Sequence, residues 1–399
     1  MSNSGSTPFR AIVATATLVL IAFSVTGGCS GESDEMGIPD LSIAQKPKNT
    51  NANGEPEREA ELKLTLGVGA RFPLKKTIAQ KLVQKSKHGN ITSTSNLALT
   101  FAIAIEREDE GRRLLNVNYQ RVQYSHELLG ERVSFDSVNP PEQIPESFQV
   151  YKGLVGNGFK FWLGARNRIA EVEGFDEFLK RCVRFAPENR QKVLLEHIVS
   201  TQKDEGFSNF VDDSIGLLPF KVGATGKESL VKEGEKWVKR RQIMRPLPMS
   251  IHTTYTVSEL RDDIARIQIF GTIFPVKSTD SKQAANQEII TLVQGHSIGS
   301  CVIDLKTGLP LHSKVDRLLD MSVQVPGQAP YKQNKTITTT IESFPVSDKP
   351  IYSKADELPL NLHQIRQTSG EENVDQKRQP EKSTGKVDTA EFELESATE

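Results

Sequence analysis

The chain has 399 residues, of which 37% are hydrophobic and 25% are charged, so its composition is that of a globular protein rather than a disordered or collagen-like one. Its formal net charge of -1 leaves no global excess of basic residues to neutralise phosphates, which argues against nucleic acid as a partner. No run of about 18 apolar residues follows the N-terminal region, so we expect no later helix to cross a membrane.

The N-terminus carries the pattern of an export signal. Residues 1–10 are mostly polar and end in a basic residue, and residues 11–25 form an apolar run that is short for a transmembrane helix. The small residues 26–28 then precede Cys29, which resembles a lipobox, with Thr26 at the position where Leu is usual. We therefore expect residues 1–28 to be a lipoprotein signal peptide.

Cys29 is the expected lipidation site of the mature chain. Acyl chains such as palmitate contribute about 0.8 kcal/mol for each buried CH₂, so a multiply acylated cysteine holds a protein stably at a membrane. By analogy with known sorting signals, Ser30 favours the outer membrane over the inner one. The alternative is a plain signal peptide followed by a chance cysteine.

Two polar segments flank the folded part. Residues 29–60 are rich in Gly, Pro, Asn and Glu and predict a disordered tether. Residues 346–399 predict a disordered tail whose last dozen residues, 388–399, carry five acidic side chains and no basic one. The tail is interpreted as a solvated end, and binding of a basic partner is the alternative.

The first half of the folded segment, residues 61–345, is predicted to form β-hairpins. Residues 62–66 are strand-like, and residues 97–106 and 113–123 flank a polar, glycine-containing turn, which predicts a long β-hairpin. Residues 142–155 are a candidate short helix. A second hairpin is expected at 159–172, where Phe159 and Phe161 share one strand face and Trp162 takes the other, either as core or as the lining of an apolar cavity.

A helical insert is expected around residues 174–206. Phe175, Phe178, Leu179 and Cys182 follow the i, i+3, i+4, i+7 spacing of one helix face. Pro187 stands at a first-turn position and starts a second helix.

The second half returns to strands, with the clearest alternation at residues 264–270. The other expected strands are 237–243, 253–257, 288–294, 301–305, 309–315 and 335–343. Strand follows strand without crossover helices, so the sheet is predicted to be antiparallel. The fold class is therefore mostly β (α+β): a curved antiparallel sheet, or two sheets, over residues 61–345.

The two halves, 61–175 and 216–345, show a weak internal echo. Gly69 and Gly234 each precede an aromatic residue by three positions, and each half then continues with a long hairpin and a short apolar one. This pattern favours an internal duplication. Because any antiparallel β protein repeats hairpins, a chance echo remains the alternative.

Cys182 and Cys301 remain if Cys29 is lipidated. In an oxidising periplasm they are candidates for one disulfide. The alternative is two small buried hydrophobic side chains, because sequence does not fix the Cα separation that a bridge requires.

The chain resembles an uncharacterised family of exported bacterial proteins, often lipoproteins, that is described only as a domain of unknown function. The resemblance covers residues 61–345 and rests on a series of short stretches: Gly69-x-x-Phe72, Phe135-Asp136-Ser137, Val172-Glu173-Gly174, Leu217-Leu-Pro219, Lys232-Glu-Gly234-Glu-Lys-Trp237 and Ile303-Asp304-x-x-Thr307-Gly308-Leu309-Pro310. It implies a curved antiparallel sheet with a helical insert. It implies no activity, cofactor or catalytic residue.

One motif suggests chemistry. Residues 295–299 match the G-x-S-x-G pattern, which in α/β-hydrolases places a nucleophilic serine, here Ser297, on a turn between a strand and a helix. The segment that follows reads as a strand, and only His312 and His363 lie further along as candidate bases. A glycine-flanked bend between two strands is therefore the preferred interpretation.

Other candidate sites are weaker. Residues 223–228 resemble a P-loop but are two residues too short, and the seven histidines show no zinc spacing, so no metal or cofactor is expected. The basic run at residues 236–245 is interpreted as a protected sheet edge, with an anionic surface as the alternative.

The sequence thus favours a non-enzymatic envelope lipoprotein, attached to the membrane through Cys29, that binds a hydrophobic ligand or a partner protein. A serine hydrolase using Ser297 and a structural scaffold are the alternatives.

Overall fold

The structure is a computed structural model that describes residues 58–86, 89–145, 148–164, 169–200, 230–243, 247–276, 289–327 and 329–343. The expected signal peptide, Cys29, the C-terminal tail and the P-loop-like segment lie outside these residues. Among the helices that are described, none is both long and apolar enough to cross a bilayer.

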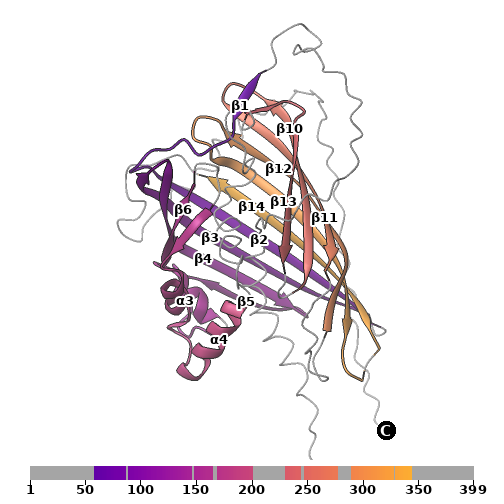
Figure 1. Ribbon diagram of the computed structural model, residues 1–399. Coiled ribbons are helices and arrows are strands. Elements are labelled where there is room, and N and C mark those ends of the chain that lie inside the picture. Colours follow the sequence, from indigo (N-terminus) through magenta and orange to yellow (C-terminus); the bar gives the residue numbers. More distant parts are fainter. Residues whose placement is uncertain are drawn as a thin grey trace, which may run out of the picture. The chain divides into compact units, whose positions relative to one another are not determined.

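Twelve strands form one antiparallel sheet that is curved and open (Figure 1). Their order is β7-β6-β4-β3-β2-β14-β13-β12-β11-β10-β9, with β5 paired to β4. The bounds are β2 (Arg71–Ser86), β3 (Gly89–Asp109), β4 (Arg112–Leu128), β5 (Glu131–Asp136), β6 (Gly158–Leu163), β7 (Ile169–Glu173), β9 (Lys236–Ile243), β10 (Met249–Leu260), β11 (Ile264–Pro275), β12 (Ile289–Asp304), β13 (Pro310–Gln324) and β14 (Tyr331–Ser343). The predicted mostly β class is confirmed.

The smaller elements are a short sheet and three helices. The strands β1 (Glu59–Glu61) and β8 (Leu230–Lys232) form a separate two-stranded sheet. The helices α2 (Gln149–Leu154), α3 (Phe175–Val183) and α4 (Glu188–Ser200) follow the first hairpins, so a helical insert is present where the sequence predicts it.

The hairpin predicted around residues 107–111 is present and longer than expected. Glu110 and Gly111 form its two-residue turn, with φ of 48° and 75°. Positive φ at both positions is the condition for the turn type whose twist matches that of the flanking strands. The turn therefore continues the twist of β3 into β4.

The two halves meet in the middle of the sheet, where β2 pairs with β14. The pairing is antiparallel over twelve residue pairs, from Lys85–Lys332 to Leu74–Ser343. The structure therefore has one main sheet, whereas the sequence allowed either one curved sheet or two sheets. The internal duplication stays a prediction.

Each strand has a buried and an open face. In β2, Leu74 and Ile78 are buried while Lys75 and Thr77 between them are partly exposed. We call the face that carries Leu74, Ile78 and the residues in register with them the inner face, and the opposite one the outer face. Strand pairing carries this alternation across the sheet, because directly opposed residues share a face.

Two apolar clusters occupy the inner face. The first includes Leu74, Phe101, Tyr119 and Ile267 and is covered by α3, whose Phe178 ring stacks on Tyr119 with centroids 6.0 Å apart. The second joins Ile78, Leu97, Tyr124, Phe135, Phe148, Tyr151, Ile251, Leu319 and Ile337, among others. The helix α2 covers part of this second cluster through Phe148 and Tyr151.

Three expected elements differ from the structure. Residues 62–66 are a loop rather than a strand, yet Leu62 and Leu64 are buried in the first cluster. Residues 289–304 are one strand, β12, where two were expected, and the helix expected over 142–155 is limited to α2. Pairing of β12 with β11 and β13 along its length accounts for the single strand, which local sequence signals do not reveal.

Candidate ligand-binding face

Buried polar side chains gather on the inner face of the sheet. Of the ten that the structure describes, nine lie there: Lys76, Gln80, Ser95, His126, Arg241, Thr253, Ser297, Gln333 and Lys335. Four of the nine are basic residues, and no Asp or Glu is buried within the described part of the chain. Burying such groups costs free energy unless they are hydrogen-bonded, so this face does not have the character of a simple apolar core.

Strand register places several of these residues in one row. Gln80 of β2 lies directly opposite Ser95 of β3, and Ser95 lies opposite His126 of β4. His126 Nε2 is 2.8 Å from Ser93 Oγ, one step along the same face. The row borders the second apolar cluster, because Gln80 follows Ile78 on β2 and faces Ile337 on β14.

Two tyrosines stand beside this row. Tyr124 of β4 and Tyr151 of α2 are stacked with ring centroids 4.9 Å apart, and each is 2% exposed. Burial raises the pKa of both phenols above their usual value, so both hydroxyls stay protonated at neutral pH. We call Gln80, Ser93, Ser95, Tyr124, His126 and Tyr151 the inner polar cluster.

Three groups of the inner polar cluster lack a hydrogen bond. They are Gln80 Nε2, Tyr124 Oη and Tyr151 Oη, all buried and without a partner among the residues that the structure describes. Leaving a buried polar group unsatisfied costs about 1–3 kcal/mol, and native proteins do so rarely. These atoms are therefore the strongest local sign of a binding site.

The position of Tyr151 is fixed by Asn157, which ties α2 to α3. The Asn157 amide donates to the Gly153 carbonyl at 3.2 Å and to the Phe178 carbonyl at 3.0 Å, and its Oδ1 accepts from Arg181 Nε at 2.6 Å. A β-carbon at Gly153 would stand 2.1 Å from the Cys182 carbonyl oxygen, so the two helices pack backbone to backbone. The phenol ring of Tyr151 is thus held over β4.

Burial also changes the titration of two basic side chains on this face. It lowers the pKa of His126, which favours the neutral imidazole, and it lowers the pKa of Lys335 to about 7. The inner face therefore becomes less positive as pH rises through neutrality.

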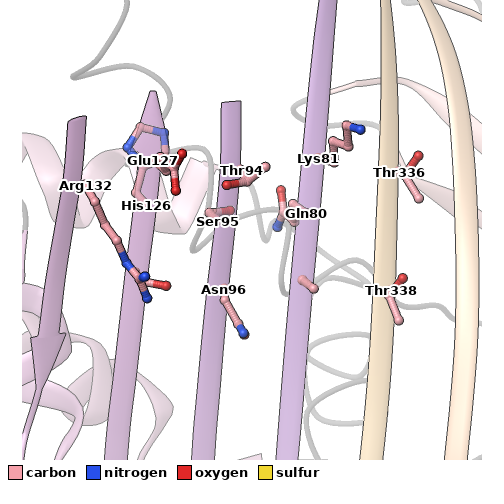
Figure 2. Close-up of a pocket in the computed structure, with 12 residues that line it drawn as sticks. Gln80, Lys81, Thr94, Ser95, Asn96, His126, Glu127, Arg132, Thr336 and Thr338 are labelled. Atoms are coloured by element: carbon pink, nitrogen blue, oxygen red, sulfur yellow. The ribbon is translucent and has the colours of Figure 1, made fainter. Parts of the chain in front are cut away.

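A polar hollow of about 400 Å³ is lined mostly by outer-face residues of the same strands, and Gln80, Ser95 and His126 of the inner polar cluster also belong to its lining (Figure 2). Register places Arg132, Glu127, Thr94, Lys81 and Thr336 in one row across β5, β4, β3, β2 and β14. These side chains are exposed or partly exposed, so water can satisfy them. The hollow does not by itself require a ligand.

An exposed apolar patch lies on the outer face of the second half. It consists of Val238, Phe270, Phe274, Ile298 and Leu318, each 38–57% exposed. Phe270 and Ile298 are directly paired on β11 and β12. Apolar groups gathered in this way on an open sheet face mark a surface that another molecule can cover.

The G-x-S-x-G segment does not form a nucleophile elbow. Residues 295–299 run straight through the strand β12, so neither the expected bend nor the turn into a helix is present. Ser297 is 3% exposed on the inner face, whereas its neighbour His296 is exposed on the outer face. The geometry that activates a hydrolase serine is therefore missing here.

Cys182 and Cys301 are both free and buried, so the disulfide that the sequence left open is not formed in the structure. Burial raises the pKa of each thiol to about 12, against smaller opposing effects of hydrogen bonds from Asn157 and Ser313. Both behave as small buried side chains.

The remaining predicted positions are found as follows. Phe159 and Phe161 are buried on the inner face, and Trp162, on the other face of β6, lies under the guanidinium groups of Arg107 and Arg112. Residues 236–243 of the basic run form β9, which ends the strand order, as an edge interpretation predicts. No group of metal-ligating side chains occurs in the described part of the chain.

Sequence reasoning missed the inner polar cluster. Apart from Tyr151 on α2, its members occupy alternate strand positions, as surface residues do, and only strand pairing shows that they face inward. The one available signal was the alternation of polar with apolar or aromatic residues in β4, which places Val122, Tyr124 and His126 on one face of the strand.

The comparisons with known proteins identify a sequence family and leave the activity open. The sequence signature of a family described as "Family of unknown function (DUF6263)" covers residues 110–310. No curated protein matches the chain by sequence.

Solved structures give distant likenesses. A structure described as "Lipid-protein interactions in lipovitellin" is 9% identical with a TM-score of 0.40, and the match covers 73% of this chain but only 27% of that one. The translocator domain of the autotransporter NalP from Neisseria meningitidis is 5% identical with a TM-score of 0.24, over 70% of this chain and 90% of that one. An outer membrane channel from Pseudomonas putida F1 is 7% identical with a TM-score of 0.18, over 70% and 97%. At these TM-scores the likenesses carry no argument about function.

Proposed function

The chain belongs to DUF6263, a family of unknown function, and we propose that it is a non-enzymatic binding protein of the cell envelope that holds a hydrophobic ligand against the inner face of its sheet. Acyl chains on Cys29 tether it to a membrane, with the outer membrane favoured over the inner one. The proposal combines an address read from the N-terminal sequence with a binding face read from the structure.

The observation that carries the proposal is the mixed character of the inner face. A face that only stabilised the fold would be filled with apolar side chains, because each buried Lys or Arg costs free energy that an apolar residue does not. Here Lys76, Arg241 and Lys335 are buried among two apolar clusters. Pockets for small molecules have this composition, apolar with a few placed polar groups.

The tether supports the same role. Residues 29–60 are polar and lack the apolar residues that would bury a core, so they suit a link between an acylated Cys29 and a domain that begins near residue 61. A ligand carrier gains from such a link because it stays close to the membrane that supplies the ligand.

The test begins with the protein purified from membranes in its mature, full-length form. Mass spectrometry of the N-terminal peptide should find an acylated Cys29, and organic extraction should release an apolar compound in near-stoichiometric amount. A mature chain that still begins at Met1, or that carries no acyl group, would remove the tether. A ligand-free protein that also fails to take up a fluorescent apolar probe would remove the binding role.

A partner protein is the second candidate, favoured by the apolar patch on the outer face. Phe270 and Ile298 are more than half exposed and directly paired, which is costly for a surface that stays in water. Crosslinking in cells with a photoreactive residue at Phe270 should capture a discrete partner, while the same residue at Lys81 in the polar hollow should not. Equal labelling at both positions would speak against a docking surface.

A further inference from the structure

We propose that the inner polar cluster recognises the carbonyl oxygens of an acyl group, whether free as a fatty acid or esterified in a lipid. The acyl chain would then lie on the second apolar cluster. This inference rests on the proposed function and specifies which ligand the inner face takes.

The first argument is the direction of the unsatisfied hydrogen bonds. Gln80 Nε2 can only donate a hydrogen bond. The protonated hydroxyls of Tyr124 and Tyr151 can also donate, and neither has an acceptor among the described residues. A ligand that fits must therefore bring acceptors, and carbonyl or carboxylate oxygens have lone pairs but no donor of their own when ionised or esterified. A hydrocarbon would leave all three groups unsatisfied.

Second, apolar side chains surround these hydrogen-bond donors. Tyr124 faces Leu97 across the β3–β4 pair, and Gln80 lies between Ile78 and Leu82 along β2 and beside Ile337 of β14. Phe135 and Phe148 close the same region around Tyr124. Donors embedded in an apolar surface suit a molecule with a short polar head on a long chain, because each CH₂ buried there contributes about 0.8 kcal/mol.

The third argument is that the donors are held in place before any ligand arrives. Tyr124 and Tyr151 are stacked on each other, and α2 is held to α3 through Asn157. Preorganised groups lose little conformational entropy on binding, which raises affinity for the head group that matches them.

The experiment compares three fluorescent probes on the mature full-length chain after delipidation: cis-parinaric acid, its methyl ester, and diphenylhexatriene, which has no oxygen. The wild-type protein should bind the acid and the ester more tightly than diphenylhexatriene. Tyr124→Phe, Tyr151→Phe and Gln80→Met should each weaken the acid and the ester by about tenfold, the loss of one hydrogen bond to a buried donor. Binding of diphenylhexatriene should not change.

Two variants are matched controls. Tyr119→Phe removes a phenol from the same strand and face but in the first apolar cluster, and Gln84→Met removes an amide from the same face of β2. Both should leave the three affinities unchanged. Unfolding of the ligand-free Tyr124→Phe protein should show no loss of stability, because the hydroxyl has no partner there; a purely structural role would make it less stable.

The outcomes separate the two claims. If no probe binds the wild-type protein, the proposed function fails and this inference fails with it. If all three probes bind equally and the cluster variants change none of the affinities, or change all three alike, the ligand-binding role stands and acyl recognition is wrong. If only the acid responds to the variants, the ligand is a free fatty acid; if the ester responds as well, an esterified lipid is equally recognised.

Discussion

Ser297 lies over Gly271 of the neighbouring strand, where a β-carbon would stand 2.2 Å from its hydroxyl oxygen. We predict that Gly271→Ala destabilises the protein by about 1–3 kcal/mol, because an added methyl must displace a buried side chain. Ser297→Ala removes the obstructing oxygen, so the double variant should recover much of that loss. Urea unfolding of the four proteins in the cycle measures the coupling, and additive effects would contradict the contact.

The same burial makes Ser297 unreactive. We expect a fluorophosphonate probe to leave the folded protein unlabelled, since Ser297 is 3% exposed and lies in a continuous strand. Treatment with the probe followed by mass spectrometry checks this, with a known serine esterase as positive control. Stoichiometric labelling of Ser297 would restore the hydrolase hypothesis.

The two buried thiols should resist reagents that attack thiolates. Because burial raises the pKa of Cys182 and Cys301 to about 12, almost no thiolate exists at pH 8. Apart from Cys29, a colorimetric thiol reagent should find no reactive group in the folded chain and two after unfolding. Cys182→Ala should lower the second value to one, and an intact disulfide in the unreduced protein would overturn the prediction.

Asp136 should contribute stability that is lost in acid. Burial alone would raise its pKa, but hydrogen bonds from Arg121, the Val138 amide and Gln123 outweigh that effect and lower it. The contribution is therefore fully present above the unfolded pKa of about 3.9 and disappears as pH falls through the folded value.

The test is Asp136→Asn, with Asp109→Asn as control, because Asp109 has only a 3.9 Å contact with Arg112 at the surface. We expect a loss of about 0.5–1 kcal/mol at pH 7 for the first variant, a modest value because the pair is partly exposed to solvent. The gap to wild type should narrow as pH falls below the unfolded pKa of about 3.9. Parallel stability curves for wild type and Asp136→Asn would contradict the assignment.

Lys335 should make the protein more stable as pH rises above neutrality. Its folded pKa is about 7, whereas an unfolded lysine titrates near 10.4, so between these values the unfolded chain binds the extra proton. The penalty is fully present below about pH 7 and shrinks by up to about 1.4 kcal/mol for each pH unit above it. Urea unfolding between pH 6.5 and 9.5 should show this slope, and Lys335→Met should flatten it. An unchanged slope in the variant would contradict burial of the amine.

The sequence predicts much of the strand pattern because local chemistry decides it. The turn at Glu110–Gly111 and the short hairpin of β6 and β7 follow from glycine and from alternation, and the helix through Phe178 follows from apolar spacing. Such signals depend on neighbours within a few residues. These elements can therefore be predicted without knowledge of the rest of the fold.

Long-range pairing accounts for what the sequence does not reveal. The strand β2 contains Pro73 and several lysines and is not among the expected strands, yet it is paired on both sides, with β3 and with β14. The glycines at 295 and 299 suggest a bend, but they allow close approach to Leu318 and Lys314 on β13. The inner polar cluster could not be predicted for the same reason. Alternating polar and apolar residues show that a strand has two different faces, but they do not show which face the rest of the protein covers.

The pairing of β2 with β14 sets an order of events for a secreted chain. Thr77 and Thr340 are direct neighbours although 263 positions separate them. Pairing of β2 with β14 therefore carries a large entropic cost of loop closure. Under the export proposed above, the chain would emerge from a translocation channel N-terminus first, and one edge of β2 would stay unpaired until β14 arrives. During that interval the nascent domain is most prone to pair with the wrong strand, so a chaperone would have its greatest effect then.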